Sequence, residues 1–362
     1  MYPALLLFMA VAATFATVRG YVPGISLVGE TFGTAVLVGW GCHKLAGHLR
    51  RRLFGRILDS EGKAVLVTGS CDTGFGNLLT RKLAAKGYHV YAGCLFPNGE
   101  GAQDLKRISN VTVLQLDVTS EHDIDAAYDT VKMSHGRNVL WAVVSNAGTL
   151  SVGFIEWQSR KTIRAAFEVN VLGAVNVSQK FMPLLKRSRG RLLFVSSIVA
   201  NFTGCQNFVA IIFLFTTEAS TRQKIPEALH LEQRLARRSS LVRPSGVRAL
   251  KKRKKIALLE RMKADMKDIP REALGSFSVK DHAVFDIALD SSLGTALSDK
   301  LDDVIDTMVL AIEESHPRPV YNVGSVGQQI VVKIFQMLPE EWIDAIFATQ
   351  WKFMEWRTST PK

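Results

Sequence analysis

Residues 63–95 read KAVLVTGSCDTGFGNLLTRKLAAKGYHVYAGCL, and this stretch indicates the architecture of the chain. Residues 63–69 form a short apolar run that ends in glycine, which is typical of a buried parallel strand. Gly74 and Gly76 then precede a helical pattern of apolar residues, and residues 89–95 have the pattern of a second strand. The N-terminus of such a helix presents free N–H groups and a positive dipole end to a pyrophosphate. Glycine turns also serve purely structural roles, but strand, turn, helix and strand in this order predict nucleotide binding.

Further strand-like and helical runs alternate along the chain, which predicts an α/β fold with a doubly wound, Rossmann-like parallel sheet. The expected strands cover 111–119, 139–148 and 190–197, and a long helix covers 163–188. Ligands bind beyond the carboxyl ends of the strands in such sheets. Asp117, Asn146, Gly148 and Ser197 fall at these ends and are therefore candidate site residues. Asn170 lies inside the long helix, where an ordinary polar position is the alternative to a functional one.

Several short motifs occur in an order and at separations that resemble the short-chain dehydrogenase/reductase family. They are VTGSCDTGFG (67–76), DVT (117–119), SNAG (145–148), Asn170 in its helix and VSS (195–197). Stretches such as HPRPVYNVG (316–324) resemble a membrane-associated branch of that family more closely. This branch contains 17β-hydroxysteroid, retinol and D-3-hydroxybutyrate dehydrogenases. The resemblance covers roughly residues 60–204 and, more thinly, 241–345.

The resemblance implies hydride transfer between NAD(P) and a lipophilic alcohol or ketone, such as a hydroxysteroid or retinol. Carried onto this sequence, the cofactor contacts fall on Gly69, Gly74 and Gly76 (pyrophosphate), Asp117 and Val118 (adenine), and Asn146, Ala147 and Gly148 (cofactor side of the sheet). Two catalytic roles can also be carried over. Ser197 would hydrogen-bond the substrate oxygen, and Asn170 would hold a water of the proton relay.

The sequence marks the choice between NAD and NADP only weakly. An acidic residue at the end of the second strand often indicates NAD. The stretch YAGCLFPN (91–98) has no acid there, and it has no arginine for a 2′-phosphate. NAD is expected from the branch that the chain resembles, and NADP stays open. The four cysteines show no CxxC pair and no metal-ligand spacing, so neither a metal site nor a disulfide framework is expected.

Two departures from the family pattern affect the site. Four residues separate Gly69 from Gly74, one more than in the family turn TGxxxGxG. The second departure is more severe, because the family's general acid/base tyrosine and its ribose-binding lysine fall on Ala210 and Leu214. A phenol with a pKa of about 10 needs a cation beside it to work near neutral pH. Alanine and leucine supply neither group, and no tyrosine lies between residues 129 and 320.

The anomaly spans roughly residues 205–240, because family-like sequence returns at LVRPSGVR (241–248) with nearly the expected spacing. A local replacement, such as a retained intron or a frame error, explains this pattern. The alternatives are a pseudoenzyme and an enzyme with another general base, for which Lys224 and His230 are candidates. A replaced segment should leave apolar surface uncovered and strand edges unpaired, so we expect poor folding or aggregation.

The N-terminal region, residues 1–56, predicts a membrane anchor with a basic flank. Residues 1–18 carry no charge, residues 24–42 carry only Glu30, and residues 43–56 are strongly basic. Because about 20 apolar residues span a bilayer, one or two spans are expected, with the basic flank on the cytoplasmic side. A cleaved signal peptide is the alternative for the first run, although the usual positive start is absent. The expected location is the endoplasmic reticulum membrane, with a mitochondrial membrane as the alternative.

The rest of the chain divides into a dehydrogenase domain at 57–325 and a C-terminal segment at 326–362. Residues 298–315 predict an amphipathic helix. Residues 328–356 are rich in Phe and Trp, which suits a lid over a lipophilic substrate, a membrane contact or ordinary core packing. Basic residues gather around KKRKK (251–255) and contribute to the net charge of +12. The plain interpretation of this cluster is a solvated helix face. No aromatic residue interleaves this cluster, so no nucleic-acid partner is expected.

Two functions from different classes therefore stay open. The first is a membrane-anchored oxidoreductase that acts on a lipophilic alcohol and carries a damaged catalytic segment. The second is a catalytically dead, nucleotide-binding membrane protein. A homo-oligomer is compatible with both.

Overall fold

The computed structural model describes residues 55–71, 74–134, 138–149, 158–197, 239–244 and 301–335, together with scattered positions elsewhere. Its strands are β1 (Lys63–Thr68), β2 (His89–Cys94), β3 (Val111–Gln115), β4 (Val139–Ser145), β5 (Arg191–Val195), β6 (Ser240–Pro244) and β7 (Val320–Val323). Its helices are α3 (Phe75–Ala85), α4 (Glu100–Lys106), α5 (Glu121–Met133), α6 (Arg160–Phe167), the π-helix η3 (Glu168–Gly173), α7 (Ala174–Ser188), α14 (Leu301–Glu313) and α15 (Val326–Phe335).

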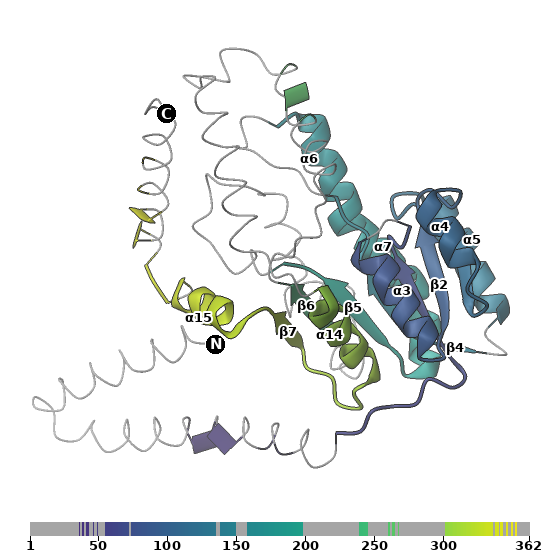
Figure 1. The fold of residues 1–362 in the computed structure, drawn as a ribbon, viewed down its shortest axis with the longest axis horizontal. Coiled ribbons are helices and arrows are strands. Elements are labelled where there is room, and N and C mark those ends of the chain that lie inside the picture. Colours follow the sequence, from purple (N-terminus) through teal and green to yellow (C-terminus); the bar gives the residue numbers. More distant parts are fainter. Residues whose placement is uncertain are drawn as a thin grey trace, which may run out of the picture.

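The seven strands form one parallel sheet in the order β3-β2-β1-β4-β5-β6-β7 (Figure 1). The strand order reverses between β1 and β4, which makes this gap the topological switch point of the sheet. The predicted doubly wound, Rossmann-like α/β fold is therefore confirmed. The strand predicted over 111–119 ends earlier, at Gln115, because Asp117 and Thr119 form a hydrogen-bonded turn instead of continuing the ladder.

Helices cover both faces of this sheet, and β1 shows how the sequence provides for both. Val65 and Val67 belong to an apolar cluster with α3 and α14, whereas Ala64 and Leu66 belong to a second cluster with α5 and α7. All four side chains are fully buried. A strand that is covered on both faces needs an apolar residue at every position, which explains its uninterrupted hydrophobic run.

The helix predicted over 163–188 begins earlier, at Arg160, and contains a π-helical turn. Its start is capped by Ser159, whose Oγ accepts a hydrogen bond of 3.1 Å from the backbone N–H of Thr162. The π turn η3 places Asn170 midway along the continuous helix. Single π turns inside α-helices are rare and frequently occur at functional sites.

The amphipathic helix predicted over 298–315 is observed as α14, and a buried arginine fixes its C-terminal end. The Arg191 guanidinium donates hydrogen bonds to the carbonyl oxygens of Ala311 (2.8 Å) and Glu314 (2.9 Å). It also lies over the ring of Trp141, 4.6 Å from the centroid, and the Arg191 side chain is 1% exposed. A cation at a helix C-terminus satisfies carbonyl groups that the helix leaves unpaired. Arg191 therefore joins α14 to the sheet.

Strand β6 tests the expectation that the anomalous segment (205–240) leaves strand edges unpaired. Its first residue, Ser240, is the last residue of that segment. It pairs in parallel with β5, where Phe194 faces Leu241, and with β7, where Val242 faces Tyr321. The expectation is wrong for this strand, because Ser240 and the apolar residues after it supply the missing sheet position. The preceding residues of the anomalous segment, with Ala210, Leu214, Lys224 and His230, lie outside the described residues.

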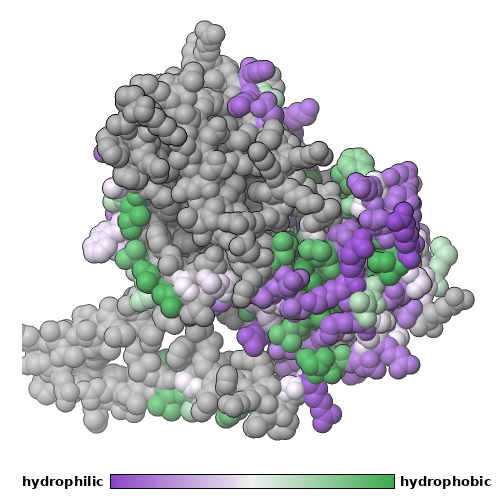
Figure 2. Space-filling model, viewed as in Figure 1, coloured by the Kyte–Doolittle hydropathy of each residue, from purple (hydrophilic) through white to green (hydrophobic). Residues whose placement is uncertain are grey.

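The predicted N-terminal membrane helices at 1–18 and 24–42 also lie outside the described residues, apart from scattered positions. Within the part of the chain that the structure describes, no helix is long and apolar enough to span a bilayer. Apolar side chains are nevertheless exposed on and after α15, at Ile330 (50%) and Trp342 (63%). In the space-filling view, apolar surface gathers over this part of the molecule, whereas hydrophilic residues dominate the helices around α3 and α5 (Figure 2).

Candidate functional site

The turn after β1 can be made only by glycine at two of its positions. Gly69 has a φ angle of +69°, in the left-handed region, and a Cβ there would lie 2.8 Å from Cα of Ala147. A Cβ on Gly76 would lie 2.4 Å from the carbonyl oxygen of Gly69 and 2.6 Å from Nδ2 of Asn146. Both glycines therefore let the first turn of α3 sit against the ends of β1 and β4.

Gly74 differs from these two glycines, because a Cβ there would meet no atom of the described residues within 4 Å. It is the N-cap of α3, no side chain in the described part of the chain caps the helix, and no acidic residue lies in its first turn. The N-termini of α5 and α6, in contrast, are capped by Ser120 and Ser159. Among the described residues, no side chain therefore caps the first N–H groups of α3 beside the switch point of the sheet, and such N–H groups suit an anion such as a pyrophosphate.

Asn146 and Ala147 hold this cradle together from β4. The Asn146 side chain donates hydrogen bonds from Nδ2 to the carbonyl oxygens of Thr68 (2.9 Å) and Gly69 (3.1 Å). The backbone N–H groups of Asn146 and Ala147 both donate to Oγ1 of Thr68, at 3.0 and 2.9 Å. Through these contacts, both residues support the glycine turn. The resemblance implied only that they line the cofactor side of the sheet, so this supporting role is an additional finding. Thr68 was missed, although its place before Gly69 in the motif is a usable signal.

Asn170 and Gly148 meet at the carboxyl end of β4. Oδ1 of Asn170 accepts a hydrogen bond of 2.8 Å from the N–H of Thr149, and its Nδ2 donates to the Thr149 carbonyl at 2.9 Å. A Cβ on Gly148 would lie 3.3 Å from the same Oδ1. The Asn170 side chain therefore holds Thr149 at the end of β4, and its role as the holder of a water in the proton relay stays a prediction.

Asp117 and Val118 follow β3 and are positioned by neighbours that the sequence did not reveal. Oδ2 of Asp123 accepts hydrogen bonds from the Asp117 N–H (3.0 Å) and from Nε2 of Gln115 (3.1 Å), and these hold the pKa of Asp123 below its usual value. Val118 is 5% exposed and packs against Gly173 of η3, where a Cβ would lie 2.6 Å from Cγ2 of Val118. The predicted adenine-contacting pair is thereby held at the sheet edge.

Ser197 lies two residues beyond the end of β5, which is the predicted place for the substrate-binding serine. Of the described tyrosines, Tyr88 precedes β2, Tyr91 lies within β2, Tyr128 is on α5 and Tyr321 is the second residue of β7. Burial raises the pKa of Tyr88 to about 12, and burial together with a hydrogen bond to Glu314 raises the pKa of Tyr321. A catalytic phenol needs a lowered pKa, so neither Tyr88 nor Tyr321 suits the role of the missing general acid/base.

No disulfide framework is expected from the cysteine spacing, but one disulfide is present among the described residues. Cys71 and Cys94 are joined, with their Cα atoms 5.2 Å apart. Their separation of 23 residues gives no hint of this contact. It arises because β1 and β2 are neighbours with Thr68 paired to Gly93, so that the residues beyond these two positions meet. Cys42 is the free cysteine among the described residues, which also contain no cluster of side chains suited to a metal ion.

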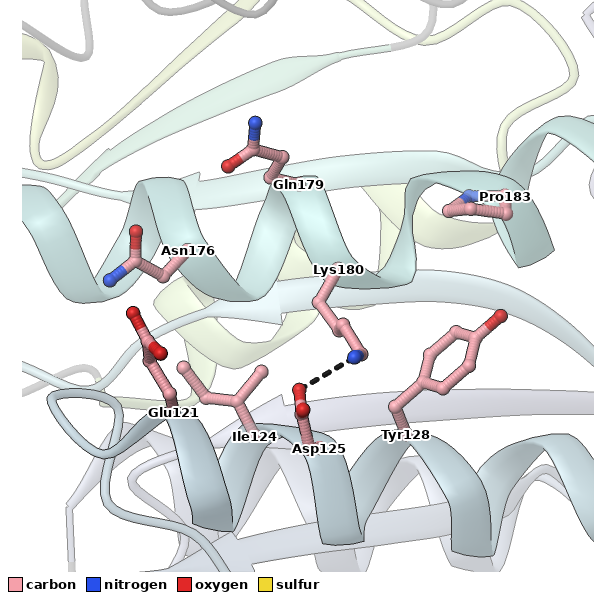
Figure 3. Close-up of a pocket in the computed structure, with 8 residues that line it drawn as sticks. All are labelled: Glu121, Ile124, Asp125, Tyr128, Asn176, Gln179, Lys180 and Pro183. Atoms are coloured by element: carbon pink, nitrogen blue, oxygen red, sulfur yellow. Dashed lines mark ion pairs between the residues drawn. The ribbon is translucent and has the colours of Figure 1, made fainter.

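A groove with a volume of about 480 Å³ lies elsewhere, between α5 and α7 (Figure 3). Its lining is Glu121, Ile124, Asp125, Tyr128, Asn176, Gln179, Lys180 and Pro183. Two of its charged groups pair with each other, since Nζ of Lys180 lies 2.6 Å from Oδ1 of Asp125. The groove runs along the outer sides of two helices and not across the strand ends, so the glycine cradle and not this groove is the candidate site.

Comparisons with known proteins identify the family of the chain. A model of the short chain dehydrogenase family matches residues 63–210 and so ends where the family tyrosine would stand. Two solved structures share the fold at 18% identity. One is a short chain dehydrogenase/reductase from Burkholderia phymatum in complex with NAD (TM-score 0.57, 80% of this chain and 96% of that chain). The other is a short chain dehydrogenase from Burkholderia cenocepacia in complex with NADP (TM-score 0.51, 84% and 100%).

Among curated proteins, the human 17-beta-hydroxysteroid dehydrogenase type 6 is 32% identical over 301 residues, which cover 80% of this chain and 89% of that protein. Retinol dehydrogenase 7 of Mus musculus is 30% identical over 73% of this chain and 81% of its own length. The mitochondrial D-beta-hydroxybutyrate dehydrogenase of Rattus norvegicus is 34% identical over 44% of this chain and 48% of its own length. This chain belongs to the short chain dehydrogenase family of NAD(P)-dependent oxidoreductases.

Proposed function

We propose that this chain binds NAD(P) at the carboxyl ends of β1 and β4 for hydride transfer to or from a lipophilic alcohol or ketone, and that its catalytic segment is damaged. The observation that carries the proposal is the N-terminus of α3 at Gly74, which no side chain of the described residues caps and which lies beside the switch point of the sheet. The cradle of Gly69, Gly76 and Asn146 is assembled around it, so the residues present fit a dinucleotide.

We assign the following roles to the residues of the site. Gly69, Gly74 and Gly76 bring backbone N–H groups close to the pyrophosphate, and Asp117 and Val118 lie at the adenine end. The bound nicotinamide supplies the hydride chemistry. Ser197 hydrogen-bonds the substrate oxygen, and the π turn at Asn170 supplies a polar anchor for the proton relay. NAD is the expected cofactor, with NADP as the alternative.

The missing step is proton transfer at the substrate oxygen. Oxidation of an alcohol releases a proton from its hydroxyl group, and a positioned base accelerates that transfer by about 10²–10⁴-fold. Ala210 and Leu214 have no group that accepts a proton or binds a ribose. The chain with this segment should therefore bind NAD(P) and turn over slowly or not at all. This observation favours a second candidate function, a nucleotide-binding membrane protein without catalysis.

Lipophilic substrates and a membrane location are part of the same proposal. Relatives named as hydroxysteroid and retinol dehydrogenases support this substrate class, and the exposed apolar side chains around α15 support contact with a lipid surface. The uncharged N-terminal run supports an anchor, in the endoplasmic reticulum or a mitochondrial membrane. A homo-oligomer and the division into an anchor (1–56), a dehydrogenase domain (57–325) and a C-terminal segment (326–362) are proposed with it.

The experiment compares the full chain with the double variant Ala210→Tyr/Leu214→Lys, both in detergent micelles. NADH binding is measured first, and NAD⁺ reduction with hydroxysteroids and retinol second. A third protein carries a whole 205–240 segment rebuilt on the family pattern. The oxidoreductase is supported if all of these proteins bind NADH and only the double variant or the rebuilt chain is active. Binding without activity in any of them supports the non-catalytic protein. Absence of NADH binding would overturn both candidate functions.

A further inference from the structure

The Cys71–Cys94 pair lies on the cofactor cradle itself. Cys71 stands between Gly69 and Gly74 in the glycine turn, and Cys94 is the last residue of β2. Val90 and Ala92 of β2 face the α3 layer, and side chains alternate along a strand, so Cys94 faces that layer too. The bond therefore connects the turn that would contact the pyrophosphate with the strand end where the adenosine ribose lies in this fold.

The neighbouring residues hold the same part of the turn. The Ser70 N–H donates to the carbonyl oxygen of Gly93 (3.0 Å), and Nδ2 of Asn77 on α3 donates to the Ser70 carbonyl (3.1 Å). A Cβ on Gly101 of α4 would lie 2.0 Å from the carbonyl oxygen of Cys71. Ser70 and Cys71 thus lie against β2, α3 and α4.

We propose that Cys71 and Cys94 form a reversible thiol–disulfide switch that controls NAD(P) binding, with the disulfide form binding more tightly. The inference rests on the proposed function, because it concerns the same nucleotide site. α3 fixes one end of the lengthened turn, and the disulfide fixes the other. A site that is ordered before binding loses less conformational entropy when the ligand binds, and its affinity is higher for that reason.

The oxidation balances with hydrogen peroxide as the oxidant. The Cys71 thiolate attacks one peroxide oxygen, so that an S–O bond forms, the O–O bond breaks and hydroxide leaves as water after protonation. The Cys94 thiolate then attacks the Cys71 sulfur, so that the S–S bond forms, the S–O bond breaks and a second water leaves. Two thiols lose two electrons and two protons in total, and a dithiol reductant reverses the change. Cys71 reacts first because it is partly exposed, whereas Cys94 is fully buried.

The test uses the full chain in detergent micelles, either reduced with dithiothreitol or oxidised with hydrogen peroxide. Peptide mapping with a thiol label identifies the bond, and NADH fluorescence titration gives the Kd of each form. The variant Cys71→Ser cannot form the bond and controls for other effects of peroxide, and Cys42→Ser is the matched control at an exposed free cysteine. We expect a 71–94 link, a Kd at least about 3-fold lower in the oxidised form and a melting temperature higher by about 5 °C. Neither difference should occur in Cys71→Ser, and both should persist in Cys42→Ser.

Three results would overturn the inference, and they separate it from the proposed function. Failure of the 71–94 link to form excludes the switch whatever the affinity for NADH. Formation of the link with equal or weaker NADH binding also excludes it but leaves the proposed function standing. Absence of NADH binding in both redox forms overturns the proposed function and the switch together.

Discussion

Two alanine substitutions in the glycine turn separate the folding role of glycine from its binding role. At Gly76, a Cβ would lie 2.4 Å from the Gly69 oxygen and 2.6 Å from Nδ2 of Asn146, the two atoms of an existing hydrogen bond. Gly76→Ala must therefore displace backbone, and we expect a loss of about 1–3 kcal/mol in the free energy of unfolding. At Gly74 the same methyl group meets no atom within 4 Å in the part of the chain that the structure describes, so Gly74→Ala should lower stability by about 1 kcal/mol or less, as an N-cap change.

For NADH binding, unlike for stability, we expect Gly74→Ala to have a large effect. The methyl group of Gly74→Ala would occupy the space in front of the first N–H groups of α3, where the pyrophosphate is expected. Loss of one charge-assisted hydrogen bond corresponds to about 1.5–3 kcal/mol, or at least 10-fold in Kd. The assay combines urea denaturation with NADH fluorescence titration of both variants. If Gly74→Ala binds NADH as tightly as the unmodified chain, the open N-terminus of α3 is not the pyrophosphate site.

Three further predictions concern the framework of the site. Arg191→Leu should lower the free energy of unfolding by about 2–4 kcal/mol in urea titrations, because two carbonyl groups at the end of α14 lose their donor. The control is Arg187→Leu at an exposed position, which should change the free energy of unfolding by less than about 0.5 kcal/mol. Asp123→Asn should be less stable than the unmodified chain at neutral pH, because the pKa of Asp123 is depressed in the folded chain. The difference in stability should vanish as the pH falls below 3.8 and through that depressed pKa. A difference that persists in acid would contradict this. Tyr88 should ionise with a pKa of about 12, so the stability that its neutral form provides is complete below pH 10 and is lost as the pH rises through about 12. Loss of the step near pH 12 from the tyrosinate absorbance titration of Tyr88→Phe would identify it, and retention of that step would contradict the assignment.

The sequence was sufficient where local pattern and chain order determine the structure. The apolar run at 63–68 and the glycines after it placed β1, α3 and the turn between them, because periodicity and glycine are local signals. Residues at strand ends, such as Asn146 and Ser197, could be placed because a parallel sheet brings its carboxyl ends to one edge. That argument locates a residue but does not say what its side chain contacts.

Pairings between distant residues could not be predicted in this way. Asn146 turns back to the carbonyl groups of β1, and Cys71 meets Cys94, because of strand neighbours and helix positions that composition does not encode. The π turn at Asn170 also lacks a local signal, since an ordinary helix has the same apolar spacing. The position of β6 was missed for the opposite reason. An unfamiliar preceding segment suggested an interrupted sheet, whereas the strand itself needs only the few apolar residues after Ser240.

The central claim is that the chain, with its present 205–240 segment, retains a nucleotide site and lacks the acid/base group that would use it. The measurement that tests this most directly is an NADH titration of the full chain in detergent micelles, followed on the same sample by a search for NAD⁺ reduction with hydroxysteroids and retinol. We predict saturable NADH binding with one site per chain and turnover at least about 100-fold below that of the same chain with a Tyr-x-x-x-Lys segment restored. Failure to bind NADH, or full turnover by the unmodified chain, would contradict the account.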